Sequence, residues 1–248
     1  MSTPAPTVVG MTETEIETET ETASSPFLAV PDVPNLRDAG AGVYRPGLLY
    51  RSAGLHLLTD EGLPRLAELG IRTVLDLRST PEVDRAPDRL PDGVAYLHLP
   101  MLPDPATVRL PWPEDQAALY PFMAETGGAA LAGAVRALAT GAPLLVHCAV
   151  GKDRTGLTIA VLQTLAGLPL EAVTADFLLS NTGLGLDRGP VPYYDLAGVE
   201  RLSRPVEAAH LHSALDRARA LHGTLDAYLR HHGATDADLA ALRTLGPA

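Results

Sequence analysis

The chain has 248 residues, 46% of them hydrophobic, and its 30 acidic and 19 basic residues give a formal net charge of −11. This length and composition suit one large folded domain, and the acidic balance excludes the basic surface typical of a nucleic-acid-binding protein. A single cysteine excludes an internal disulfide and a cysteine-rich zinc site, and it fits a cytoplasmic location.

The first 26 residues differ in composition from the rest. They hold five Glu and no basic residue, with Thr and Glu alternating from residue 12 to residue 22. Like charges repel and neither face of this alternation is apolar, so residues 1–26 are predicted to be a disordered acidic tail before one folded domain at 27–248. Because no leader pattern and no apolar run near 18 residues occurs, we expect neither a secretory signal nor stable membrane insertion.

The first half of the domain is predicted to alternate short strands with one helix. Thr59 is the expected N-cap of that helix and Gly70 its end, although Pro64 favours a later start or a kink. The expected elements are strands at 43–44 and 48–50, a helix at 59–69, strands at 72–77 and 94–99, and a Pro-rich loop at 102–113.

The second half is predicted to be mostly helical around one central strand. The expected elements are helices at 115–125 and 129–140, a strand at 144–146, helices at 155–166 and 170–180, a long Gly- and Pro-rich segment at 182–205, and helices in the last 40 residues. Because a connector as long as 182–205 is unusual, it is a candidate flap over a site. Strands alternate with helices, which predicts an α/β fold with a central, mainly parallel sheet flanked by helices.

The only cysteine and the only lysine lie four positions apart in the string from His147 to Gly156, between a predicted strand and a predicted helix. Ligands of such sheets bind beyond the carboxyl ends of the strands, and a helix N-terminus favours an anion. Gly151 allows a close backbone approach, and the guanidinium of Arg154 can hold two phosphate oxygens at once. The predicted phosphate cradle consists of the backbone at Ala149, Val150, Gly151, Lys152, Asp153 and Arg154.

Cys148 is the predicted nucleophile. A helix N-terminus and nearby cations favour the thiolate, whose sulfur can attack phosphorus and form a phosphocysteine intermediate. Thr155 is expected to donate a hydrogen bond to this sulfur, and His147, with Gly156, to support the loop without acting as a base. The alternative is that Cys148 is a buried structural residue at the end of a strand.

This string resembles the Cys-x5-Arg loop of the protein tyrosine phosphatase superfamily, and its Gly-Lys-Asp-Arg-Thr-Gly form is similar to the bacterial PtpB/LipA-like group. The resemblance implies the fold of that superfamily and activity on phosphotyrosine, other phosphoproteins or phosphoinositides, including dual specificity. Residues 182–205 are shorter than the helical lid of the PtpB type. The further matching strings are Asn35-Leu36-Arg37-Asp38, Tyr50-Arg51-Ser52-Ala53, Asp76-Leu77-Arg78-Ser79 with Glu82-Val83, and Ala175-Asp176-Phe177-Leu178-Leu179-Ser180-Asn181.

Two carboxyl groups are candidates for the general acid that protonates the leaving oxygen. The resemblance assigns this role to the Asp inside the loop, which is Asp153. The rival is Glu114, because Trp112-Pro113-Glu114 resembles the mobile Trp-Pro-Asp loop of eukaryotic tyrosine phosphatases. Lys152 resembles the lysine of phosphoinositide-cleaving loops, where a second cation favours multiply charged substrates; the alternative is that it only supports the cradle.

A buried ionic scaffold is expected beneath the loop, with Asp76 and Arg78 at the end of a neighbouring strand. Its predicted members are Arg37, Arg51 and Arg78, paired with Asp38 and Asp76. The histidines outside the cysteine string carry no predicted function: His210 and His212 do not share a helix face, and His231 and His232 suit the C-terminal dipole of a helix. No cofactor and no metal site is predicted.

These residues predict a metal-independent, cysteine-dependent phosphomonoester phosphatase. Its expected partners are a phosphorylated substrate, which can be a phosphoprotein, a phosphoinositide or a small phosphorylated metabolite, and inorganic phosphate as product. The alternatives are a non-catalytic phosphate-binding regulatory module and a sulfurtransferase. A dithiol arsenate reductase is excluded because it needs further cysteines.

Overall fold

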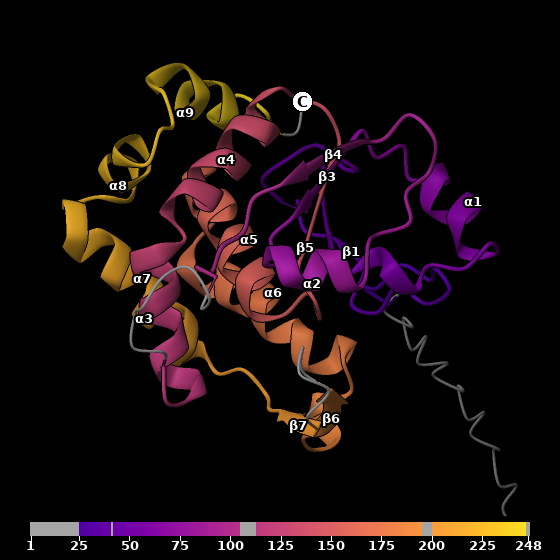
Figure 1. Ribbon diagram of the computed structural model, residues 1–248. Coiled ribbons are helices and arrows are strands. Elements are labelled where there is room, and N and C mark those ends of the chain that lie inside the picture. The colour runs from indigo at the N-terminus through magenta and orange to yellow at the C-terminus, as the bar shows by residue number, and fades with distance from the viewer. Residues whose placement is uncertain (1–24, 41, 105–112, 195–199, 247–248) are drawn as a thin grey trace, which may run out of the picture.

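A five-stranded, mainly parallel sheet runs through the part of the chain that the computed structural model describes, which is residues 25–40, 42–104, 113–194 and 200–246 (Figure 1). The strands are β1 (Arg37–Asp38), β2 (Leu49–Ser52), β3 (Thr73–Asp76), β4 (Ala95–His98) and β5 (Leu144–His147). Their order is β1-β2-β5-β3-β4, and only β1 is antiparallel to its neighbour. The predicted α/β fold is confirmed, and the predicted tail at 1–26 lies outside the described residues except for 25 and 26.

Helices flank this sheet on both faces (Figure 1). Their bounds are α1 (Gly62–Glu68), α2 (Thr80–Arg85), α3 (Gln116–Thr126), α4 (Gly128–Ala139), α5 (Asp153–Leu165), α6 (Leu170–Gly183), α7 (Ala208–His222), α8 (Leu225–His231) and α9 (Asp236–Arg243), with short 3₁₀ turns at Leu55–Leu57 and Leu186–Arg188. No helix in the described ranges is long and apolar enough to cross a membrane.

The central strands are buried on both faces because alternate side chains point to opposite sides of a sheet. In β5, Leu144 and Val146 pack into the larger core with α3 to α9, whereas Leu145 packs into a smaller core with Leu66 of α1. Val74 of β3 likewise contributes to the smaller core. The carboxyl ends of β3 and β5 are therefore held rigidly side by side, and the cysteine loop follows directly from one of them.

Two expectations for the first half of the domain are wrong in detail. Residues 43–44 form a turn, not a strand, and the buried Tyr44 donates a hydrogen bond of 2.7 Å to the carbonyl of Leu162. Helix α1 begins at Gly62, not at Thr59, although the Thr59 hydroxyl accepts a hydrogen bond of 3.3 Å from the Gly62 amide. This later start places Pro64 in the first turn, where its missing N–H costs no helical hydrogen bond.

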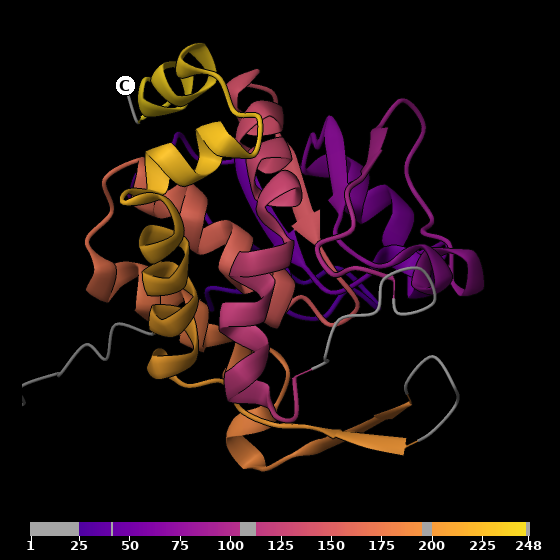
Figure 2. The same cartoon turned by 60° about the vertical axis from the view of Figure 1, so that its left-hand side comes forward.

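The predicted segment at 182–205 contains an antiparallel hairpin, which the sequence reading did not anticipate. Helix α6 extends to Gly183, and β6 (Val191–Tyr194) then pairs with β7 (Glu200–Ser203) in the register Val191↔Ser203. Figure 2 shows this hairpin projecting below the helices. The hairpin lies beside the cysteine loop, where Ser203 and the following Arg204 contact Lys152.

Candidate active site

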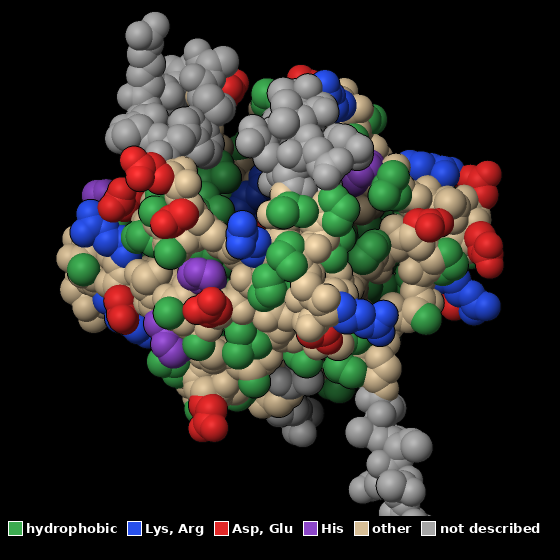
Figure 3. Space-filling view, turned by 90° about the horizontal axis from the view of Figure 1, so that it is seen from below, with side chains coloured by type: hydrophobic (Ala, Val, Ile, Leu, Met, Phe, Trp, Pro, Cys, Tyr) green, Lys and Arg blue, Asp and Glu red, His purple; other side chains and the backbone are tan. Residues whose placement is uncertain are grey.

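A cavity of about 700 Å³ opens at the carboxyl ends of β3 and β5, where the cysteine loop begins. The view from below shows a hollow with basic side chains inside it (Figure 3). Its walls come from the loop, α2, the start of α3 and the end of β7: Ala149, Val150, Lys152, Asp153, Arg154, Arg78, Glu82, Arg85, Glu114, Leu119, Leu202, Ser203 and Arg204 are among the lining residues. Segments distant in the sequence therefore meet around the predicted phosphate cradle.

The backbone of the loop is oriented by hydrogen bonds on the side away from the cavity. The carbonyl of Gly151 accepts hydrogen bonds of 2.9 Å from Asn35 and 2.9 Å from Arg51, and the carbonyl of Ala149 accepts one of 3.0 Å from the Gly54 amide. In a trans peptide the N–H points opposite to the carbonyl, so the amides of Val150 and Lys152 point toward the cavity. Two donors of the predicted cradle thus face the space where a phosphate would bind.

Gly151 itself is required by this geometry. Its φ is +67°, in the left-handed region, and a Cβ at this position would overlap the backbone of Ser52. Only glycine meets both conditions without displacing β2. Helix α5 then begins at Asp153, with the Gly156 amide donating a hydrogen bond of 2.9 Å to the carbonyl of Lys152.

The ionic scaffold beneath the loop differs in part from the predicted one. Arg37 and Arg51 pair with Asp176 of α6, each at 2.9 Å, and not with Asp38 or Asp76. Asp38 instead accepts hydrogen bonds from the backbone of its own turn, at Gly40. Burial would raise the pKa of Asp176, but Arg51 and Arg37 hold it below its usual range. Asp38 does not pair with Arg37 because successive strand residues point to opposite faces of the sheet, so the two side chains cannot serve the same site.

The predicted pairing of Asp76 with Arg78 is present and extends to a residue that the sequence did not single out. Arg78 lies 2.7 Å from Asp76 and 2.9 Å from Asp88. His147 bridges this group to the loop, with Nε2 2.9 Å from Asp88 and Nδ1 3.1 Å from the Cys148 carbonyl. His147 thus contacts the backbone at the start of the loop, and its supporting role stays a prediction. Asp76, Asp88 and His147 lie close enough to surround a cation, but the guanidinium of Arg78 already supplies the positive charge there.

Arg154 is held by a carboxylate from α2. Its two terminal nitrogens donate hydrogen bonds of 2.6 and 2.8 Å to the two oxygens of Glu82. Burial would raise the pKa of Glu82, but the hydrogen bonds from Arg154 lower it to about 2. A guanidinium has five N–H donors, so three remain for a phosphate. The ion pair thus fixes the orientation of the Arg154 guanidinium and leaves N–H donors free for a phosphate.

Glu82 has a second task at the start of α2. Its carboxylate accepts hydrogen bonds of 2.7 Å from the Ser79 amide and 2.8 Å from the Ser79 hydroxyl, which makes a capping box with Ser79 as N-cap. Helix α2 itself was not predicted. The Ser-x-x-Glu spacing with Pro81 in the first turn is the sequence signal that could have found it.

Cys148 directly precedes Ala149 of the cavity wall and is itself only 2% exposed. Burial would lower the pKa of Arg154, but electrostatic interactions, with Cys148 first and Glu82 next, raise it. The hydroxyl oxygen of Thr155 is buried without a hydrogen-bond partner among the described residues. An unpaired hydroxyl at this position is available to donate to a sulfur or to a bound phosphate.

Both candidate acids line the same cavity. Asp153 accepts a hydrogen bond of 2.7 Å from the hydroxyl of the buried Tyr120, and this interaction, after burial itself, raises the pKa of Tyr120 well above its usual range. Glu114 is exposed and lies directly before Asp115, the N-cap of α3. Trp112, the first residue of the string that carries the rival assignment, lies outside the described residues.

The side chain of Lys152 forms hydrogen bonds with the end of the hairpin, which the sequence did not predict. Its ammonium donates hydrogen bonds of 3.1 Å to the Ser203 hydroxyl and 2.7 Å to the carbonyl of Arg204, and it lies 3.7 Å from a carboxylate oxygen of Asp153. The residue is only 4% exposed. Lys152 therefore joins the cysteine loop to the end of the hairpin, in addition to lining the cavity.

Several residues of the site were not assigned a role from the sequence. They are Asn35, which binds the loop; Asp176 and Asp88, which complete the ionic scaffold; Glu82, which holds Arg154; Tyr120, which binds Asp153; and His56, which lines the cavity. Asn35, Asp176 and Glu82 belong to strings that match the resemblance. Tyr120 and Asp88 carry no local signal, because only the tertiary fold brings them to the loop.

The chain is similar to several known proteins. A sequence model of the tyrosine phosphatase family matches residues 28–245. The triple specificity protein phosphatase PtpB of Mycobacterium tuberculosis is 35% identical over 193 residues, which are 62% of this chain and 70% of PtpB. A putative tyrosine-protein phosphatase of Cupriavidus necator is 32% identical over 60% of this chain and 59% of its own length. The crystal structure of P. aeruginosa TpbA aligns with a TM-score of 0.38 and 22% identity, over 64% of this chain and 81% of TpbA.

Proposed function

We propose that this chain, which belongs to the tyrosine phosphatase family, hydrolyses phosphate monoesters through a phosphocysteine formed at Cys148. One observation carries the proposal. In the loop that follows the buried Cys148, Val150, Lys152 and Arg154, the last held by Glu82, line one cavity, and the amides of Val150 and Lys152 point toward it. That combination of donors fits three phosphate oxygens and leaves the fourth, esterified oxygen pointing outward.

The first half of the reaction moves the phosphoryl group to sulfur. The thiolate of Cys148 attacks phosphorus, an S–P bond forms, and the bond from phosphorus to the leaving oxygen breaks with its electron pair. The leaving oxygen takes a proton from an acid at the mouth of the cavity. Asp153 is our assignment for this acid, because Tyr120 fixes one of its oxygens at 2.7 Å while the carboxyl group still lines the cavity.

The second half returns the enzyme to its starting state. Asp153, now a carboxylate, removes a proton from a water molecule that attacks phosphorus, and the S–P bond breaks to release inorganic phosphate. Thr155 is assigned a hydrogen bond to the departing sulfur, since its buried hydroxyl has no other partner among the described residues. No step in this sequence calls for a metal ion or a cofactor.

The substrate class that fits the cavity best is an aryl phosphate such as phosphotyrosine. Leu119 and Leu202 offer apolar contact above the cradle, and both lie in the cavity wall. The ammonium of Lys152, which would favour a second phosphate group, is directed to Ser203 and Arg204 instead. This makes phosphoinositides and multiply phosphorylated metabolites the weaker alternatives.

A hydrolysis panel in the presence of EDTA tests the proposal. It compares an aryl phosphate, phosphotyrosine and phosphoserine peptides, phosphoinositides, and sugar or nucleoside phosphates, with a thiosulfate–cyanide assay for sulfur transfer. We expect phosphotyrosine to exceed phosphoserine in kcat/KM by at least ~10-fold, and EDTA to have no effect. Phosphate binding without any hydrolysis would instead support a regulatory module, and thiocyanate formation would support a sulfurtransferase.

A further inference from the structure

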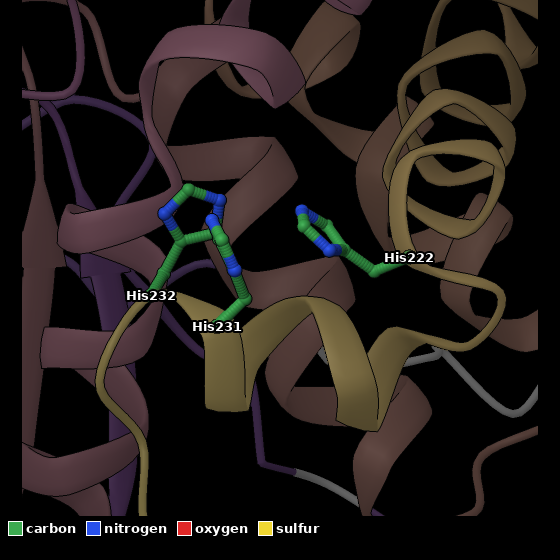
Figure 4. Close-up of side chains that lie close together, drawn as sticks. All are labelled: His222, His231 and His232. Atoms are coloured by element: carbon green, nitrogen blue, oxygen red, sulfur yellow. The ribbon is translucent and has the colours of Figure 1, made fainter.

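Three histidine side chains converge at the C-terminal ends of α7 and α8 (Figure 4). They are His222, the last residue of α7, and His231 and His232, at the end of α8. One ring nitrogen of each can be chosen so that all three lie within 4.8 Å of one another. The ring centroids of His222 and His231 are 4.1 Å apart, and that of His232 lies 5.8 Å from His222 and 5.0 Å from His231.

The backbone builds this convergence. Gly223, with a φ of +82°, ends α7, and the Thr224 hydroxyl caps α8 by accepting a hydrogen bond of 3.0 Å from the Ala227 amide. This short reversal turns α8 back so that its last residues return to the end of α7. Sequence spacing did not predict the group because His222 and the His231-His232 pair lie on different helices. The expectation that His231 and His232 suit the end of a helix did not include His222.

His232 has a fixed position from which it can act as a ligand. Its ring lies directly on Gly128, where a Cβ would overlap it, and packs 4.7 Å from the ring of Tyr228. Tyr228 is itself buried and donates a hydrogen bond of 2.6 Å to the carbonyl of Ala124 in α3. One imidazole of the group is thus held by packing, while His231 is exposed.

The hydrogen bonding of the three histidines also fits a ligand site. None of the three imidazoles has a hydrogen-bond partner within the described ranges, so their nitrogens are available. The ring nitrogens of histidine are common metal ligands, and polar side chains packed together normally have hydrogen-bond partners.

We propose that His222, His231 and His232 form a binding site for a divalent late transition-metal ion, with Zn²⁺ as the reference ligand. Imidazole nitrogens suit Zn²⁺, Cu²⁺ and Ni²⁺, whereas Mg²⁺ and Ca²⁺ require oxygen ligands. Zn–N bonds of about 2.0–2.1 Å in tetrahedral geometry place the nitrogens about 3.3 Å apart. The ring of His231, which now stacks on His222 at 29°, must therefore turn, and water completes the coordination.

The site is separate from the proposed active site. The cavity is lined by Gln116 and Leu119 in the first turns of α3, whereas His232 packs on Gly128, just beyond the other end of that helix. Metal binding joins α7 to α8 and, through His232, to the start of α4. We therefore assign the ion a structural role and expect its effect in stability, independent of phosphatase activity.

Zn²⁺ titration by calorimetry on the full, tag-free chain tests the proposal. The host protein carries Cys148→Ser, because a thiolate in the active site would add a second Zn²⁺ ligand. We expect one Zn²⁺ per chain, with affinity at least ~10-fold weaker in His222→Gln and in His231→Gln, since loss of even a supporting partner of a ligand costs 10–100-fold. His212→Gln is the matched control, because His212 lies on the same helix and contacts Thr174 at 3.0 Å.

Two further readouts keep the test decisive. Co²⁺ should give the visible absorption bands of a four-coordinate nitrogen site in the host and not in His231→Gln. Because His231 is exposed, we expect this variant to keep the fold intact. Saturating Zn²⁺ should raise the melting temperature of the host and of His212→Gln, and not that of His231→Gln. Absence of saturable binding, or equal Zn²⁺ affinity in the host and in both histidine variants, would overturn the site.

Discussion

Replacing Glu82 by Gln separates the charge of the residue from its shape. Glu82 and Arg154 share two hydrogen bonds of 2.6 and 2.8 Å. Burial raises the pKa of Glu82, but Arg154 and, to a smaller extent, Ser79 lower it from 4.5 to about 2. Glu82→Gln keeps one acceptor oxygen and loses the other together with the charge. One hydrogen bond to a charged group contributes about 1.5–3 kcal/mol, so we expect kcat/KM for an aryl phosphate to fall about 10- to 100-fold.

A double-mutant cycle shows whether Glu82 acts through Arg154. Arg154→Lys keeps the charge but loses the planar fork, and we expect it alone to cost at least ~100-fold in rate. If Glu82 only orients the fork, adding Glu82→Gln to Arg154→Lys should cost no more than about 3-fold further. The assay is steady-state kinetics of all four proteins, with circular dichroism as the check on folding. Fully multiplicative losses, or a Glu82→Gln variant with wild-type kinetics, would refute the orienting role.

Three further predictions follow from the same geometry. Asp153→Asn should slow a phosphate ester with a poor alkyl leaving group by about 10²–10⁴ and an activated aryl ester far less, whereas Glu114→Gln should do neither; the reverse pattern moves the acid to Glu114. Lys152→Met should speed amide exchange in β7 by about 10-fold, since it removes the bonds to Ser203 and Arg204, and unchanged exchange refutes the tether. Folding lowers the pKa of Glu82, so the extra stability of wild type over Glu82→Gln should be full above about pH 4.5 and vanish toward pH 2. Urea unfolding at pH 7 and pH 3 measures this difference in stability, and an equal difference at both pH values contradicts the prediction.

The strands and most helices could be predicted because their signals are local. The strands at 72–77, at 94–99 and before Cys148 are short runs between breakers, and the structure places β3, β4 and β5 within one or two residues of them. The sequence did not show that β4, unlike β3 and β5, is only half-buried or exposed. The cysteine loop could be predicted for the same reason, since its strand, Gly151 and helix start are consecutive. The parallel order then follows from alternation of strands with helices.

What the sequence missed depends on contacts between distant segments. Asp176 replaces Asp38 as the partner of Arg37 because α6 crosses behind the loop, which no spacing reveals. Glu82 meets Arg154 across 72 positions, and His222 meets His231 only because Gly223 reverses the chain. The hairpin at 191–203 was missed because its Gly- and Pro-rich surroundings mask two four-residue strands.

The central claim, that sulfur carries the phosphoryl group, is tested most directly by acid quenching during turnover of an aryl phosphate. Mass spectrometry of the digested protein should then find one phosphoryl group on the peptide that contains Cys148, and its amount should fall when the substrate is exhausted. The Cys148→Ser variant should bind phosphate yet show no turnover. Rapid hydrolysis with no phosphoryl group on Cys148 at any quench time, or near wild-type turnover by Cys148→Ser, would contradict the account.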